Sequence, residues 1–389
     1  MTLQEIINQT NDYIAHYTTG GSIELEQKIR AINRAIEYIE SKLGLPSNER
    51  VFDFDLITGK NYYDLPTDFR EPIDLVFADD AKNTKDNEFE YVPASEIIKK
   101  LGHITLVNRF SITYFNGKKQ ILVFSKETGV KFLIESFRYL TGLTAENDLT
   151  NLSIDNIDNV VAFDIDTTAS SQTFGALKKT PIASFNLSSQ IRRGNLFFRS
   201  NIFLASKEFT SINLRFGSSA TDYWEMLTDK DINGNPFSAL KWNEILWDFR
   251  QATKTGNPDP TSITFFSIIF HENANFTTST GFKIRDLYLE EPIPMKLIYY
   301  SLIKGTNFDG TQNKIFLDET NDIVGFGNFT PELIHPVALE AATYLVPQLR
   351  KDQQYWSLYD VKAKEILNEI GKMYPRKRRI NYGSIKFGR

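Results

Sequence analysis

Apolar residues recur at helical spacing near both ends of the chain. Between residues 22 and 43 they follow one another at steps of three and four, as Leu25, Ile29, Ile32, Ile36, Ile39 and Leu43. This spacing places them on one face of an amphipathic helix, and Gly44 and Pro46 mark its end. Residues 2–17 and two patterns within 331–374 carry similar stripes. The pattern predicts an N-terminal helical hairpin on which C-terminal helices pack.

The period of the pattern changes to two after residue 50. Alternating residues and a proline-bounded stretch lead into a predicted strand at 73–77. Segments 111–115 and 120–124 flank the dipeptide Asn116-Gly117, which favours a hairpin turn. A further segment at 130–139 is expected to complete this small sheet.

The stretch from residue 150 to 292 is rich in Ser, Thr, Asn and Phe. Its short apolar segments are separated by turn-rich pieces, which is typical of an all-β sandwich of roughly seven or eight strands. The sheet before it and the helices after it look like halves of one interrupted domain. The predicted fold class is α+β, in which a helical connector domain with a small antiparallel sheet is interrupted by a jelly-roll-like sandwich. The predicted parts are 1–149, 150–292, 293–374 and a basic tail, 375–389.

Composition and charge exclude several classes of protein. The chain has 389 residues, a formal net charge of −5 and no cysteine. The acidic balance argues against a protein that coats nucleic acid with its whole surface, and the lack of cysteine excludes disulfides and thiolate metal sites. The chain has neither a membrane-length apolar run nor a signal-peptide pattern at its start. We expect a soluble protein, made in a cytoplasm and without contact to a membrane.

The C-terminal tail is the most strongly charged segment and contains no acidic residue. Its basic residues are Arg376, Lys377, Arg378, Arg379, Lys386 and Arg389. Clustered cations are typical of segments that dock on an acidic protein surface or meet DNA phosphates. A solvated tail is the third interpretation. Docking on a partner protein is the one that we favour.

Candidate chemistry elsewhere is sparse. Asp229, Asp231, Asn233 and Gly234 have the spacing of the first half of a calcium-binding loop, but Leu240 occupies the position of the bidentate glutamate. We interpret this segment as a polar turn and predict no metal site. The histidines are isolated in the sequence: His16, His103, His271 and His335. We expect neither an enzyme nor a bound cofactor.

The order of elements resembles the head-to-tail connector, or ring, proteins of short-tailed bacteriophages. The similarity rests on YDLPTDFREPIDLVF, the SEIIKKLG helix, the FNGKKQILVF hairpin, ESFRYLTGLTAENDLT and the closing PELIHPVALEAATYLV helix. It covers about residues 1–148 and 296–375. The sandwich is a departure from the simple connectors. The bias toward Asn, Ile, Lys and Phe suits a phage of an AT-rich gut host, and the crAss-like phages are the group that the chain resembles most.

This resemblance implies a structural role in the virion tail or neck. It implies about twelve copies in a ring beneath the portal protein. Such a ring continues the channel for double-stranded DNA, without sequence-specific binding, and docks the next tail ring or hub protein. The protein would be made in the cytoplasm of the bacterial host.

A glycan-binding adhesin, or a tail-fibre-attachment protein acting through the sandwich, is the alternative. Sandwich domains often bind sugars on aromatic side chains, and Tyr223, Trp224, Trp242 and Trp247 are candidates. Trp242 and Trp247 lie in a strand-like segment, where burial between sheets is the commoner fate.

Overall fold

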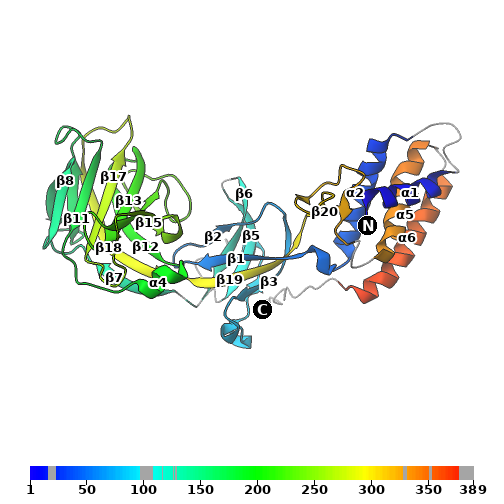
Figure 1. The fold of residues 1–389 in the computed structure, drawn as a ribbon, viewed down its shortest axis with the longest axis horizontal. Coiled ribbons are helices and arrows are strands. Elements are labelled where there is room, and N and C mark those ends of the chain that lie inside the picture. The colour runs from blue at the N-terminus through cyan, green and yellow to red at the C-terminus, as the bar shows by residue number, and fades with distance from the viewer. Residues whose placement is uncertain are drawn as a thin grey trace, which may run out of the picture.

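Three parts follow one another along the longest axis of the molecule (Figure 1). The computed structural model describes residues 1–15, 23–96, 108–115, 117–125, 127, 129–326, 331–349 and 353–375. A β-sandwich forms one end, two small sheets form the middle and a helical bundle forms the other end. By residue content the fold is mostly sandwich-like sheet with some helices.

The bundle consists of helices from both ends of the chain. They are α1 (Leu3–Ile14), α2 (Leu25–Lys42), α5 (Ile334–Leu349) and α6 (Gln353–Met373). Helix α5 packs on each of the other three. The predicted stripe of α2 is buried from Ile29 onward, whereas Leu25 is half exposed. The expectation that the C-terminal helices return to the N-terminal ones is confirmed.

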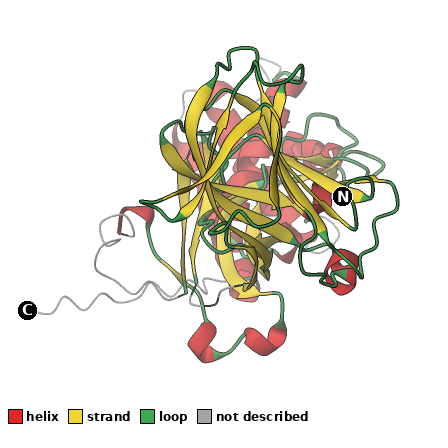
Figure 2. Ribbon diagram, turned by 90° about the vertical axis from the view of Figure 1, so that its left-hand side faces the viewer, coloured by secondary structure: helices red, strands yellow, loops and turns green. Residues whose placement is uncertain are grey.

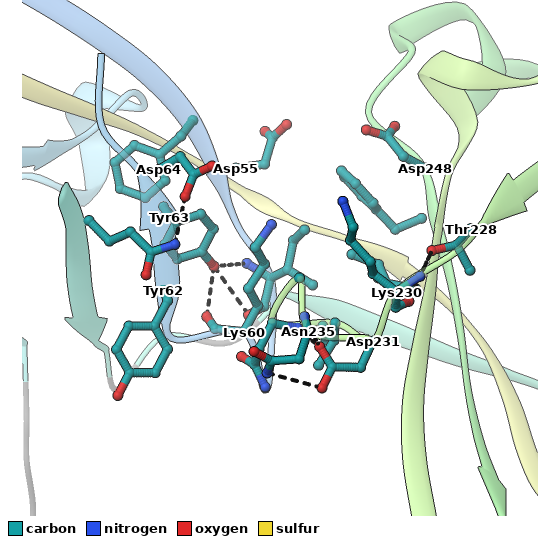
Figure 3. A pocket seen from close by; sticks show the side chains of 18 of the residues that line it. Asp55, Lys60, Tyr62, Tyr63, Asp64, Thr228, Lys230, Asp231, Asn235 and Asp248 are labelled. Carbon is teal, nitrogen blue, oxygen red and sulfur yellow. Dashed lines mark hydrogen bonds between the residues drawn. The ribbon is translucent and has the colours of Figure 1, made fainter. Parts of the chain in front are cut away.

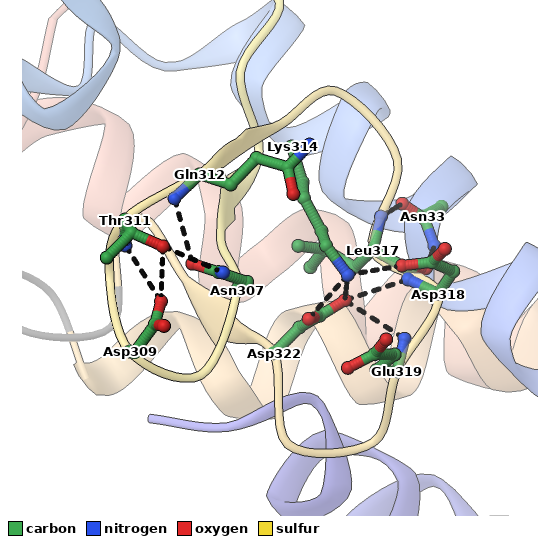
Figure 4. Close-up of polar contacts among 10 residues, drawn as sticks. All are labelled: Asn33, Asn307, Asp309, Thr311, Gln312, Lys314, Leu317, Asp318, Glu319 and Asp322. Carbon is green, nitrogen blue, oxygen red and sulfur yellow. Dashed lines mark hydrogen bonds and ion pairs between the residues drawn. The ribbon is translucent and has the colours of Figure 1, made fainter.

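A short sheet covers one side of the bundle. It contains β20 (Gly305–Thr306), β21 (Asn313–Lys314) and β22 (Ile323–Val324), and residues 305–326 are called the β20–β22 segment below. Its backbone holds the start of α1, because the amide of Leu3 donates to the carbonyl of Asp322 at 2.9 Å. Buried Asn33 of α2 bonds both backbone groups of Leu317, at 2.8 and 2.9 Å (Figure 4).

Two small sheets share the core of the middle part. One has the order β1 (Glu49–Leu56), β19 (Ile293–Ser301) and β3 (Phe69–Phe77). The other has the order β2 (Tyr62–Asp64), β6 (Lys118–Phe124), β5 (Arg109–Phe115) and β4 (Glu90–Tyr91). The predicted hairpin is confirmed, since β5 pairs with β6 up to Phe115 and Lys118. Because β19 lies between β1 and β3, residues that follow the sandwich complete a sheet that begins before it.

The sandwich consists of two six-stranded sheets around one aromatic-rich core (Figure 2). One sheet contains β7 (Val130–Glu135), β9 (Leu149–Asp155), β10 (Val160–Ile165), β12 (Phe197–Leu204), β15 (Lys241–Asp248) and β18 (Ser279–Glu291). The other contains β8 (Leu143–Asn147), β11 (Phe174–Lys179), β13 (Phe209–Gly217), β14 (Tyr223–Thr228), β16 (Thr253–Thr255) and β17 (Phe265–Glu272). Helix α4 (Ser188–Arg193) precedes β12.

Two details of the predicted sheets are wrong. The segment at 130–139 does not complete the small middle sheet, because β7 pairs with β18 of the sandwich. Strand β18 is 13 residues long, so one half of it pairs with β10 and the other half with β7. The expectation of seven or eight strands is too low, because strands such as β16 are short and exposed and lack the apolar alternation that reveals a strand in a sequence.

A buried carboxyl lies where the bundle meets the middle sheets. Glu40 of α2 is almost fully buried, and its Oε2 lies 3.7 Å from the Nη1 of Arg70 on β3. Burial raises the pKa of the Glu40 carboxyl from 4.5 to about 7, although the charges of Arg70 and Lys304 oppose the shift. The junction therefore favours the protonated acid.

We predict that Glu40→Gln removes a pH dependence of folding. A carboxyl whose pKa is raised by folding stabilises the folded state at low pH, and this stabilisation is lost as the pH rises from 4.5 through about 7. The free energy of unfolding of the wild type should fall over this range by at most about 3 kcal/mol relative to the variant. Denaturant unfolding at a series of pH values measures this difference. Glu369→Gln, on the exposed face of α6, is the matched control and should follow the wild type.

Candidate functional site

A cleft of about 980 Å³ lies between the middle sheets and the sandwich (Figure 3). One wall is formed by β1, β2 and the turn between them, with Asp55, Lys60 and Tyr63. The facing wall comes from β15 and from the β14–β15 connection, residues 229–240. Charged side chains of both signs line the space, so this is the site where acid–base or ion-binding chemistry is most reasonably sought.

Arg250 connects the two walls of the cleft. Its guanidinium lies 2.8 Å from Asp55 of β1 and 2.7 Å from Asp248 at the end of β15. Burial raises the pKa of the Asp55 carboxyl, whereas the charge of Arg250 lowers it. One cation thus satisfies two carboxylates that belong to different parts of the molecule.

The β1–β2 turn is held by Tyr63. The hydroxyl of Tyr63 accepts from the amide of Ile57 at 2.9 Å and donates to the carbonyl of Lys60 at 2.8 Å. The ammonium of Lys60 lies 5.2 Å from the centre of the Tyr63 ring. Burial lowers the pKa of Lys60 and raises that of Tyr63. Both groups hold the turn in place, which leaves neither hydroxyl nor ring free to act on a ligand.

The facing turn contains the residues with calcium-loop spacing. The Oδ1 of Asp231 accepts from the amides of Asn233, at 2.9 Å, and Asn235, at 2.8 Å. Gly234 has a φ of +79°, which favours glycine. The interpretation as a polar turn is confirmed, because the Asp231 carboxylate bonds its own loop. Across the described residues, no group of three or more His, Cys, Asp or Glu side chains is placed to hold a metal ion.

Beside the cleft, the tip of the β1–β2 turn is inserted into the sandwich. Glu290 of β18 is completely buried, and its Oε1 accepts from the amide of Thr58 at 2.6 Å. Arg199 of β12 donates to the carbonyl of Thr58 and pairs with Glu290 and with Glu244 of β15. Ile57 packs against sandwich residues in the same place. Sequence reasoning missed this joint, because its members are far apart in the chain and fall in no motif.

The structure leaves the predicted tail site untested. The residues proposed for partner docking lie outside the described residues, which end at Pro375: Arg376, Lys377, Arg378, Arg379, Lys386 and Arg389. Their role stays a prediction. Of the isolated histidines, His335 contacts the hydroxyl of Tyr13, and burial lowers the pKa of His271. His16 and His103 lie outside the described residues.

The aromatic candidates of the sandwich have different environments. Trp247 is fully buried and its Nε1 donates to the carbonyl of Ile212 at 2.8 Å, so its expected burial is confirmed. Trp224 is also buried and stacks on Phe216. Trp242 is half buried on the outer face of β15, where the guanidinium of Arg285 lies 4.5 Å from its ring.

A second surface that sequence reasoning missed lies on the bundle. The β20–β22 segment exposes large apolar side chains, at 68% for Phe308 and 48% for Phe316. Helix α6 exposes Leu358 and Val361 to a similar extent. The available signal was the presence of Phe308, Ile315 and Phe316 within an otherwise polar segment. Monomeric proteins expose single apolar residues, but grouped ones are typical of binding surfaces.

We predict that Arg199→Met weakens the joint between the sandwich and the middle sheets. It leaves the buried Glu290 without its cation, which should lower the free energy of unfolding by about 3–5 kcal/mol. The double variant Arg199→Met/Glu290→Gln should recover part of this loss, because the completely buried carboxylate is then gone, and only part of it, because Glu244 still lacks its cation. Arg193→Met, whose side chain is 67% exposed and 3.9 Å from Glu291, is the control and should cost under about 1 kcal/mol. Calorimetry measures the series, and equal losses in the Arg199 and Arg193 variants would contradict the assignment.

Several comparisons with known proteins bear on the chain. No curated protein matches it. Among solved structures, an agarase is 9% identical over 41% of this chain and 24% of its own, with a TM-score of 0.26. A family 30 carbohydrate-binding module is 11% identical over 43% of this chain and 98% of its own, with a TM-score of 0.27. A module of the same family, from a cellulosomal cellulase of Clostridium thermocellum, is 12% identical over 41% and 96%, also at 0.27. The chain spans about a quarter of the agarase, and TM-scores this low carry no argument about fold or function.

Among the described residues, no helix is both long and apolar enough to span a membrane. Residues 1–165 match the model of a family described as SU10 adaptor protein. The matched region includes α1, α2 and most strands of the middle sheets and extends to the end of β10. The N-terminal part of this chain is therefore similar to a phage adaptor family, which supports a structural adaptor of a virion.

Proposed function

We propose that this protein is a structural virion protein that forms a ring between the portal and the tail of a bacteriophage. The observation that carries the proposal is the match of residues 1–165 to the SU10 adaptor family. The bundle and middle sheets that begin in this region are completed by β19, α5 and α6 from beyond the sandwich. The matched region also includes the first sandwich strands, β7 to β10, so the similarity extends from this unit into the sandwich.

The chemistry of the cleft supports a structural rather than a catalytic role. Asp55 and Asp248 share Arg250, and the Asp231 carboxylate bonds its own turn. Asp64 accepts from Gln120 at 2.6 Å and pairs with Lys118 at 3.0 Å, and the hydrogen bond from Gln120 contributes most to lowering its pKa. These pairs hold the turns and sheets of the cleft in place, and the Arg250–Asp55 pair also joins the sandwich to β1.

The partners follow from the position of such a ring. One face meets the portal protein, the other meets the next tail ring or hub protein, and double-stranded DNA passes through the lumen without sequence-specific binding. A closed ring of one kind of chain has cyclic symmetry, and we take it to be a dodecamer. The basic tail docks on an acidic surface of the portal through Arg376, Lys377, Arg378, Arg379, Lys386 and Arg389.

We expect the full-length protein to form a ring, alone or on the portal. Light scattering should give a mass of about twelve 44.7 kDa subunits in at least one of these conditions. A variant with the six basic tail residues changed to Gln keeps the tail length and should bind the portal more weakly. The affinity of the wild type for the portal should fall more steeply with added salt than that of the variant, because salt screens the basic residues. A strict monomer in both conditions would contradict the ring.

One observation favours a second candidate function, in which the sandwich binds a glycan on a host or fibre. Trp242 lies opposite Phe203 on the outer face of the sheet and is partly exposed there. An aromatic ring bordered by polar side chains is the usual platform for a sugar.

This second candidate predicts that the full-length chain selects particular glycans on an array. Trp242→Ala should abolish the signal, because the platform is removed. Tyr139→Ala, at a 71% exposed position of the same sandwich, should retain it. An array without selective signals for the wild type would remove this candidate and leave the adaptor proposal unaffected.

A further inference from the structure

The β20–β22 segment presents apolar side chains on a fixed backbone. Phe308 is 68% exposed, Phe316 is 48% exposed and Ile315 is 45% exposed, whereas Leu317 beside them is fully buried. An exposed aromatic side chain that loses little conformational freedom on binding is typical of an interaction hot spot. We therefore expect these exposed side chains to form a surface that binds another protein chain.

Polar contacts keep the segment in place (Figure 4). Lys314 lies 2.8 Å from Asp322 and 2.5 Å from Asp318, which ties the two ends of the loop together. The carboxylate of Asp322 also accepts from the amide of Asp318 at 2.9 Å. Asn33 anchors Leu317 to α2. The backbone that carries Phe316 is thus bonded on both sides before any partner binds.

Helix α6 presents a second apolar strip. Leu358 is 52% exposed and Val361, three residues further along the same face, is 49% exposed. The opposite face of α6 is used inside the subunit, because Ala363, Leu367 and Ile370 are buried. The described residues therefore leave this face of α6 uncovered.

The two apolar surfaces lie at opposite ends of α1. The β20–β22 segment holds its start, through the bond from Leu3 to Asp322. Helix α6 contacts its end, where the hydroxyl of Tyr359 donates to the carbonyl of Tyr13 at 3.1 Å. A helix of this length spans roughly 18 Å. Figure 1 shows β20 on the side of α2 that faces the middle sheets and α6 on its other side.

This separation is what a ring requires. A closed ring of identical subunits uses a heterologous contact, in which two different surfaces of each subunit meet on neighbouring copies. A single self-complementary surface would give a dimer instead. One pair of opposite charges accompanies these surfaces, although the exposed face of α6 also carries Glu365 and Glu369. The β20–β22 segment carries Asp309, Asp318, Glu319 and Asp322 against one lysine, and Glu319 has no ion-pair partner among the described residues. Lys362 of α6, next to Val361, is exposed and likewise unpaired within that part of the chain.

The geometry points to a contact between a second copy of this chain and the β20–β22 segment, in which Phe308 and Phe316 of one subunit pack on Leu358 and Val361 of the next. This inference rests on the proposed ring and names the surfaces that close it. Glu319 and Lys362 border the contact with opposite charges.

Paired variants of the full-length protein test this contact. Phe308→Ser/Phe316→Ser removes the first surface, and Leu358→Ser/Val361→Ser removes the second. Both pairs are exposed, so the melting temperature should stay close to that of the wild type. Each variant alone should need at least about tenfold more protein to assemble than the wild type. Ile157→Ser, at a 90% exposed site of the sandwich, is the control and should assemble normally.

Mixing the two variants distinguishes a heterologous contact from a general loss of non-specific hydrophobic association. Each variant keeps the surface that the other lacks, so an equimolar mixture should give heterodimers that cannot extend, detected by native mass spectrometry. In the same way Glu319→Lys and Lys362→Glu should each weaken assembly, and one chain with both changes should recover it. Rings that form normally from either apolar variant, a mixture without heterodimers, or no recovery in the charge-reversed chain would overturn the contact and leave the ring itself intact. A wild type that stays monomeric, alone and with the portal, would instead overturn the proposed function.

Discussion

The orientation of the sandwich depends on one completely buried carboxylate, that of Glu290. It accepts from the amide of Thr58 and faces the guanidinium of Arg199, so the tip of the β1–β2 turn is bonded into the sheet of another part of the molecule. A buried charge is tolerated only when its partners are in place, and this makes the joint sensitive to geometry. The chain also enters and leaves the sandwich near this joint, just before β7 and at the end of β18. A Cβ at Gly129, just before β7, would lie 2.4 Å from the carbonyl oxygen of Glu291 at the end of β18. The two chain crossings are therefore packed against each other beside this joint, and the Arg250–Asp55 pair is a further connection between the sandwich and β1.

The rest of the molecule is one unit made from both ends of the chain. Strand β19 lies between β1 and β3, and α5 packs on α1, α2 and α6. The sandwich lies between β6 and β19 in the sequence, and the sheet and bundle on either side of it in the chain are complete.

The cleft and the apolar surface of the bundle illustrate different uses of side chains. In the cleft, carboxylates and cations of the two walls neutralise one another, as Arg250 does between Asp55 and Asp248. Such paired groups fix the geometry of the cleft, and their hydrogen-bonding atoms are already used within the protein. On the bundle, Phe308 and Phe316 have no such internal use, although the backbone beneath them is heavily bonded. An adaptor acts by contact rather than by chemistry, and exposed apolar side chains on a fixed backbone are suited to such contacts.

The sequence by itself determined the elements that depend on local periodicity. The stripe from Ile29 to Ile39 was sufficient for α2, the Asn116-Gly117 dipeptide for the β5–β6 hairpin, and Asp231 with Gly234 for a polar turn, because each is fixed by residues within a few positions. Only the tertiary structure decided which strand β7 joins, since the strand-forming segment VKFLIE has no alternation that would tell pairing with the middle sheet from pairing with β18. The same holds for the buried Glu40 and Glu290 and for the exposed Phe308. Burial is set by elements hundreds of residues away, and no local pattern of polar and apolar positions contains that information.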